Sequence, residues 1–238
     1  MELKPLTILA LSFLLPQSAG ATTDLEARYQ AAVADAEIAT AEEISRDLTA
    51  ISSNNNQLIW QADNKALLVV TWTGWDGYDS QVGNTIQLSR DVWVTAAPQL
   101  QQFCQGQRSA LNDNALTLRL EQLMGLPPHN GKSRFVELWV KPGDMFRPSP
   151  DPAITDHEAE LDFPIATGMT ISESHKAWIT NLKATSYGPN GYPWTRLGYT
   201  YDWGQSKSHV GLSEFVVREG AQVQVREVQN LQAYCQTH

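Results

Sequence analysis

The chain has 238 residues, of which 42% are hydrophobic and 18% charged, and its formal net charge is −9. A chain this acidic repels nucleic-acid phosphates and anionic lipid headgroups, so we expect no nucleic-acid partner and no membrane-surface role. The length suits one large domain or two small ones, and the lack of an internal repeat or low-complexity linker favours one.

Residues 1–21 have the pattern of a secretory signal peptide. Lys4 gives a basic start, an apolar run extends from Leu6 to Leu15, and Ala19-Gly20-Ala21 offers the small residues at which a signal peptidase cleaves. The run is too short to cross a bilayer, which takes roughly 20 apolar residues. We therefore expect an exported protein without a membrane span, located in the periplasm or outside the cell after cleavage.

We interpret residues 22–52 as an N-terminal helical arm. Thr23-Asp24-Leu25-Glu26 has the form of a capping box, and no Gly or Pro follows it as far as Ile51. Apolar residues recur at helical spacing, as one long amphipathic helix or as two with a break near Thr40. This thin stripe either covers the core of its own chain or supports self-association through residues 24–51.

The rest of the chain, residues 53–238, is expected to form one globular domain. Strand patterns occur at 58–60, 66–73, 85–88, 91–95, 134–141, 196–203, 212–218 and 221–228. Helical patterns occur at 98–105, 114–124 and 172–186. Glu219-Gly220 predicts a hairpin between the last two strands, and the three prolines of 144–154 predict an irregular loop. The interleaving favours an α+β fold with a mixed, mostly antiparallel sheet and flanking helices.

Cys104 and Cys235 are the only cysteines of the chain. An even pair in an oxidising compartment usually forms a disulfide, and no CxxC motif points to redox activity or metal binding. We therefore expect one structural disulfide that closes a loop of roughly 130 residues, and neither a metal site nor a cofactor.

The sequence contains no GxSxG, HExxH, SxxK, P-loop or EF-hand pattern, which argues against the commonest serine hydrolases and zinc peptidases. Reactive residue types are densest between positions 196 and 214. A His beside a carboxylate can act as general acid or base, and an Arg can bind an anionic group. The candidate catalytic residues are therefore Arg196, Asp202, His209 and Glu214. The alternative is structural, with Arg196 and Asp202 paired across a strand.

Eight tryptophans make the chain rich in aromatic side chains. Trp75, Tyr78 and Trp194 fall on Gly- or Pro-rich turns, where rings are harder to bury and can stack on sugars or peptide side chains. The proline-rich segment adds Arg147 and Asp151 on a preformed surface. These five are the candidate ligand-binding residues, and the alternative is that every ring is buried in the core.

Three functions follow from these patterns. The sequence favours an exported binding or interaction module that recognises a glycan, a peptide or a small polar molecule. The first alternative is a secreted hydrolase or transferase that uses the cluster at 196–214. The second is an assembly protein that associates through its N-terminal helix.

Overall fold

The computed structural model describes residues 19–63, 65–164 and 170–236. The predicted leader lies almost entirely outside these residues. The helices are α1 (Ala19–Ala36), α2 (Ala97–Arg108), α3 (Asp113–Leu123), α4 (Glu173–Ser186) and α5 (Leu231–Tyr234). The strands are β1 (Leu67–Thr73), β2 (Thr85–Gln87), β3 (Val92–Ala96), β4 (Arg134–Val140), β5 (Met145–Phe146), β6 (Tyr199–Tyr201), β7 (Val210–Val217) and β8 (Gln222–Gln229). Within the described ranges, no helix has the length and apolarity needed to cross a membrane.

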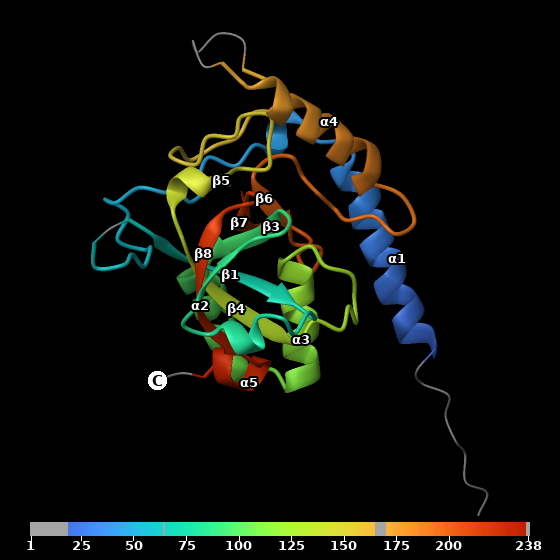
Figure 1. The fold of residues 1–238 in the computed structure, drawn as a ribbon. Helices are drawn as coiled ribbons and strands as arrows, with labels where there is room; N and C mark the ends of the chain where they lie inside the picture. The colour runs from blue at the N-terminus through green and yellow to red at the C-terminus, as the bar shows by residue number, and fades with distance from the viewer. Residues whose placement is uncertain (1–18, 64, 165–169, 237–238) are drawn as a thin grey trace, which may run out of the picture.

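These elements confirm the predicted α+β fold, with one sheet and helices packed around it (Figure 1). The strand order is β2-β8-β4-β1-β3-β7-β5, with β6 also paired to β7. Every strand pairing among the described residues is antiparallel, so the sheet is not mixed.

The sheet is strongly curled, as the link between β7 and β8 shows. These two strands are consecutive in the chain, yet β4, β1 and β3 lie between them. In a flat sheet they would be about 19 Å apart. The linker 218–221 spans at most about 18 Å when fully extended, and it contains a turn at Gly220. The sheet must therefore curl until the end of β7 approaches the start of β8.

The hairpin predicted at Glu219-Gly220 is wrong, because β7 and β8 pair with other strands. The Gly220 amide donates to the carbonyl of Leu88, and the Leu88 amide donates to that of Ala221. Gly220 supplies the reversal of chain direction that its φ of 84° allows. The turn itself does not determine which strands β7 and β8 pair with.

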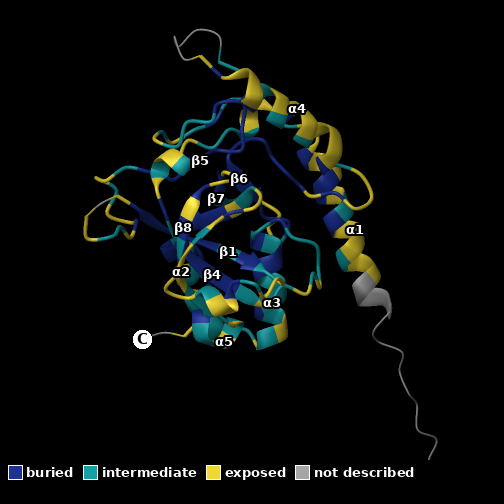
Figure 2. Ribbon diagram, in the orientation of Figure 1, coloured by how far each residue is buried: buried dark blue, intermediate teal, exposed yellow. Residues whose placement is uncertain are grey.

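Apolar residues cover both faces of the sheet. Since successive side chains of a strand point to opposite faces, β1 sends Leu67 and Val69 into one core and Leu68 and Val70 into the other. The second core lies against α2, α3 and α5 and contains the Cys104–Cys235 disulfide, whose Cα atoms are 5.2 Å apart. The predicted disulfide is confirmed, and such a bond indicates an oxidising compartment. In Figure 2 the central strands are accordingly buried.

The N-terminal arm is helical only in its first half. α1 ends at Ala36, and the capping pattern at Thr40 begins a short 3-10 turn, Ala41–Glu43. The helical continuation to Ile51 is wrong, because the Leu48 amide donates to His157 and the Ile51 amide donates to Ile154. This part of the chain is held extended against the proline-rich segment instead.

The apolar side of α1 packs against its own chain. Tyr29, Ala32, Val33 and Ala36 form a core with Tyr201 and Trp203. The Tyr201 hydroxyl also donates to Asp35 Oδ2 at 2.6 Å. The apolar stripe of α1 therefore covers the core of its own chain, which was the first of the two alternatives. A second copy of the chain would have to displace these contacts.

Candidate functional site

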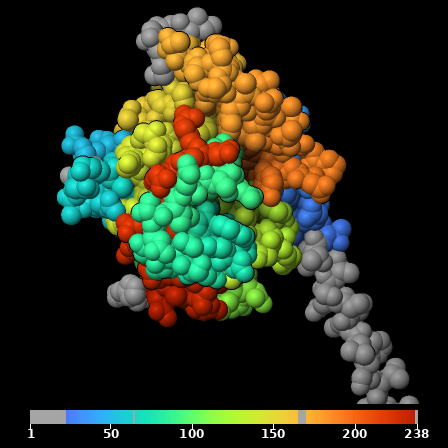
Figure 3. Space-filling model, in the orientation of Figure 1, coloured from blue at the N-terminus to red at the C-terminus, as the bar shows by residue number. Residues whose placement is uncertain are grey.

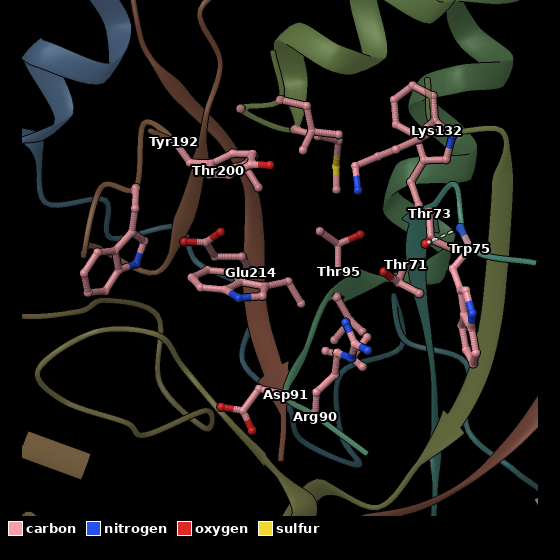
Figure 4. Close-up of a pocket in the computed structure, with 18 of the residues that line it drawn as sticks. Thr71, Thr73, Trp75, Arg90, Asp91, Thr95, Lys132, Tyr192, Thr200 and Glu214 are labelled. Atoms are coloured by element: carbon pink, nitrogen blue, oxygen red, sulfur yellow. Dashed lines mark hydrogen bonds between the residues drawn. The ribbon is translucent and has the colours of Figure 1, made fainter. Parts of the chain in front are cut away.

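A cavity of about 680 Å³ opens where two central strands separate. β1 pairs with β4 along its whole length, from Leu67 to Thr73. With β3, however, it pairs only through Val69↔Ala96 and Val70↔Thr95. Beyond Val70 the two strands diverge, and the end of β1 and the start of β3 line the cavity (Figure 4). The split between these strands therefore positions the site.

Aromatic rings surround much of the cavity. They belong to Trp72, Trp75, Tyr78, Trp93, Tyr192, Trp194 and Tyr201. Trp75 and Tyr192 are 59% and 52% exposed, whereas Trp194 is buried and its Nε1 donates to the Pro148 carbonyl. In the space-filling view, the segment 75–95 lies at the front of the molecule beside the loop that follows α4 (Figure 3). The rings thus provide apolar faces both at the mouth and inside.

Two polar side chains without partners lie side by side on the cavity wall. Thr95 of β3 is directly opposite Glu214 of β7, so both side chains project to the same face of the sheet. Thr95 is 1% exposed and Glu214 is 8% exposed. Neither Thr95 Oγ1 nor Glu214 Oε1 has a hydrogen-bond partner, although buried polar atoms nearly always have one. Both residues line the cavity, where a ligand atom can supply the missing partner (Figure 4).

The environment of Glu214 favours the protonated form of its carboxyl group. Burial raises the pKa of Glu214 well above its ordinary value, and the Arg147 guanidinium only partly opposes this. A protonated carboxyl group donates one hydrogen bond and accepts others, as the Thr95 hydroxyl also does. The pair can therefore recognise hydroxyl, amide or carbonyl groups.

Two basic side chains, those of Lys132 and Arg90, also line the cavity. Lys132 extends toward its centre (Figure 4), and its partial burial lowers the pKa of its ammonium group. Arg90 lies at an exposed position of the lining. The carboxylate of Asp91 is already engaged, since its two oxygens accept from Trp178 Nε1 and from the Glu219 amide, each at 2.8 Å.

The structure places three of the five predicted ligand-binding residues on the cavity: Trp75, Tyr78 and Trp194. The other two are engaged inside the proline-rich loop. Arg147 is completely buried and donates through Nε to the Ala153 carbonyl at 2.9 Å, while Asp151 accepts from the Ala153 amide at 2.8 Å. These two residues shape the loop and do not line the cavity.

The side chains of the four predicted catalytic residues have separate partners, although the Asp202 amide donates to the His209 carbonyl at 2.8 Å. Glu214 lines the cavity, but Asp202 forms a two-point ion pair with Arg119 of α3, at 2.9 and 2.5 Å. Arg196 donates to the Glu37 carbonyl, and the His209 ring stacks on Tyr201 with its Nδ1 unpartnered. The hydrogen bonds of the described residues join none of these four side chains to another. The Arg196–Asp202 pair of the structural alternative is also not formed.

Thr95 and Lys132 are cavity residues that the sequence did not single out. The available signal was weak: Thr95 is a polar residue inside an apolar strand, and Lys132 follows a turn. Thr95 and Lys132 line the same cavity only because β1 and β3 diverge, which the sequence does not show. The described residues also include no cluster of His, Cys, Asp and Glu suited to a metal ion.

No family model, no curated protein and no solved structure matches this chain. The geometry and chemistry of the cavity are therefore the evidence that it is a functional site.

Proposed function

We propose that this chain is an exported binding protein that takes up a small molecule in the cavity between β1 and β3. The observation that carries the proposal is the adjacent pair of buried, unpartnered oxygens on Thr95 and Glu214. A buried polar atom without a partner costs roughly 1–3 kcal/mol, and a bound ligand would remove that cost. Export is supported by the leader pattern of residues 1–21 and by the disulfide.

The cavity wall defines what the ligand must offer. One part must hydrogen-bond with Thr95 and Glu214, and a flat or apolar part must lie against the surrounding rings. Sugars, peptide side chains and small polar molecules with an apolar face all have this combination. The proline-rich loop supports the wall through Pro148, which holds Trp194.

A hydrolase or transferase remains the second candidate because of Glu214 alone. A carboxyl group whose pKa is raised by burial is suited to act as a general acid. Arg196, Asp202 and His209 have no part in this version of the proposal, since they do not line the cavity. Turnover of a bound compound that disappears in Glu214→Gln would favour the enzyme over the binding protein.

A thermal-shift panel tests the binding proposal. Monosaccharides, dipeptides and aromatic acids would be screened against the wild type and against Thr95→Val and Glu214→Gln. A ligand at a hundred times its Kd stabilises the fold by about 2.7 kcal/mol, which raises Tm by several degrees. We expect at least one compound to do so, and Thr95→Val to weaken its binding about fivefold, the effect of one lost hydrogen bond. Glu214→Gln keeps a donor and an acceptor and should weaken binding less.

Glu137→Gln is the matched control. Glu137 is also a buried strand glutamate, but it pairs with Arg226 and does not line the cavity. This variant should leave ligand affinity unchanged. A panel without a stabilising compound, or hits that bind both cavity variants as well as the wild type, would contradict the proposal.

A further inference from the structure

Lys132 is a cavity residue whose charge has no counterpart. Its side chain extends into the cavity, and no hydrogen bond or ion pair joins it to another described residue (Figure 4). Burial lowers its pKa and nothing compensates that effect. Taking a charge out of water is costly unless an opposite charge accompanies it, and the described residues supply no such charge to the Lys132 ammonium group.

The acidic side chains of the lining do not supply that counterpart. Asp91 already accepts hydrogen bonds from Trp178 and from the backbone of Glu219. Glu214 forms no ion pair with Lys132, and its burial raises the pKa of its carboxyl group, which disfavours the charged form. With Arg90 at the exposed part of the lining, the cavity is locally basic although the whole chain carries a net charge of −9.

The rest of the lining is suited to an apolar body. Beside the aromatic rings, it includes Leu88, Met124, Leu126 and Leu182. Trp72 adds an indole Nε1 that is buried without an acceptor. Trp72 and Lys132 thus offer hydrogen-bond donors that have no acceptor, inside a wide apolar lining. A ligand that fits must combine an acceptor group with an apolar body.

Building on the proposed function, we infer that the ligand is a small organic anion with an aromatic or otherwise apolar body. Its acidic group pairs with Lys132, its body lies among the tryptophan rings, and a polar atom reaches Thr95 and Glu214. A neutral sugar would leave the Lys132 ammonium unpaired. A cationic ligand would face both Lys132 and Arg90, and like charges inside a cavity repel strongly.

Two dyes with the same ring system test the charge requirement. The anionic probe is 8-anilinonaphthalene-1-sulfonate, and the neutral probe is N-phenyl-1-naphthylamine, which lacks the sulfonate. Both fluoresce more strongly in apolar surroundings, so their Kd values can be measured by titration of the intact protein. We expect both to bind, and Lys132→Met to weaken the sulfonate dye about tenfold, which corresponds to 1.4 kcal/mol. The neutral dye should change less than twofold.

Two further variants serve as controls: Lys132→Arg keeps the charge in the cavity, and Lys141→Met removes a charge outside it. Arginine keeps the charge and should retain most of the affinity for the sulfonate dye. Lys141 is exposed and lies outside the cavity, so its loss should alter neither Kd. If Lys132→Met does not fold, Lys132→Gln, which also removes the charge, takes its place under the same expectation.

The outcomes separate the two claims. If removal of the Lys132 charge affects both dyes equally, or neither, the anion inference is overturned while binding of the neutral dye keeps the proposed function. If neither dye binds, the cavity does not accept apolar ligands and both claims fail.

Discussion

Glu214 gives the sharpest prediction about the empty protein. Glu214→Gln should stabilise the unliganded fold, and the gain should grow as the pH rises. In the folded chain, burial raises the pKa of Glu214, so the group keeps its proton to a higher pH than in the unfolded chain, which releases it above about pH 4.3. The contribution of Glu214 to the stability of the wild type is therefore fully present below the unfolded-state pKa. It is lost as the pH rises toward the folded-state pKa.

The magnitude follows from proton linkage. Between the two pKa values, the unfolded state binds one proton fewer than the folded state, so the wild type loses about 1.4 kcal/mol per pH unit through this group. Glutamine cannot titrate, and it has nearly the shape of the protonated acid. The free energies of unfolding of the two proteins should therefore be similar near pH 4 and separate with that slope at higher pH.

Urea unfolding at a series of pH values from 4 to 7 measures this difference directly. Glu219→Gln is the control, because Glu219 is exposed beside the end of β7. A difference between the wild type and Glu214→Gln that stays constant with pH, or that shrinks as the pH rises, would refute the raised pKa of Glu214.

Two further predictions concern the scaffold. Replacing Cys104 and Cys235 by Ser should cost about 5 kcal/mol in urea unfolding, because the disulfide spans 131 positions; an unchanged midpoint would argue against a stabilising bond. Gly198→Ala should lower Tm by several degrees, since Gly198 has a φ of 73° and a Cβ would lie 2.5 Å from Arg147 Cδ. Gly143→Ala, which meets open space, should change Tm little, and equal effects of the two would count against the close approach.

The strands of this fold were predictable because their residues alternate or run apolar in short segments. The run from Ala66 to Thr73 indicated a strand covered on both faces, and β1 is buried in this way. Strand pairing was not predictable, because a turn such as Glu219-Gly220 fixes a reversal and not a partner. The helical pattern of 44–51 was likewise overridden by hydrogen bonds to residues more than a hundred positions away.

The candidate site was predictable in part. Turn aromatics pointed to Trp75, Tyr78 and Trp194, which line the cavity, and Glu214 belonged to the suspected reactive cluster. The other members of that cluster are held by distant partners, as when Asp202 pairs with Arg119, 83 positions earlier. Sequence proximity cannot show such partners, and it cannot show the divergence of two strands that creates a cavity.

A crystal structure of the protein with 8-anilinonaphthalene-1-sulfonate would show where an anionic ligand binds. We predict that the dye occupies the cavity between β1 and β3, with its sulfonate at Lys132 Nζ and its rings among the tryptophans near Thr95 and Glu214. A complex in which the dye lies elsewhere on the protein and the cavity holds none of it would show that the cavity is not the binding site.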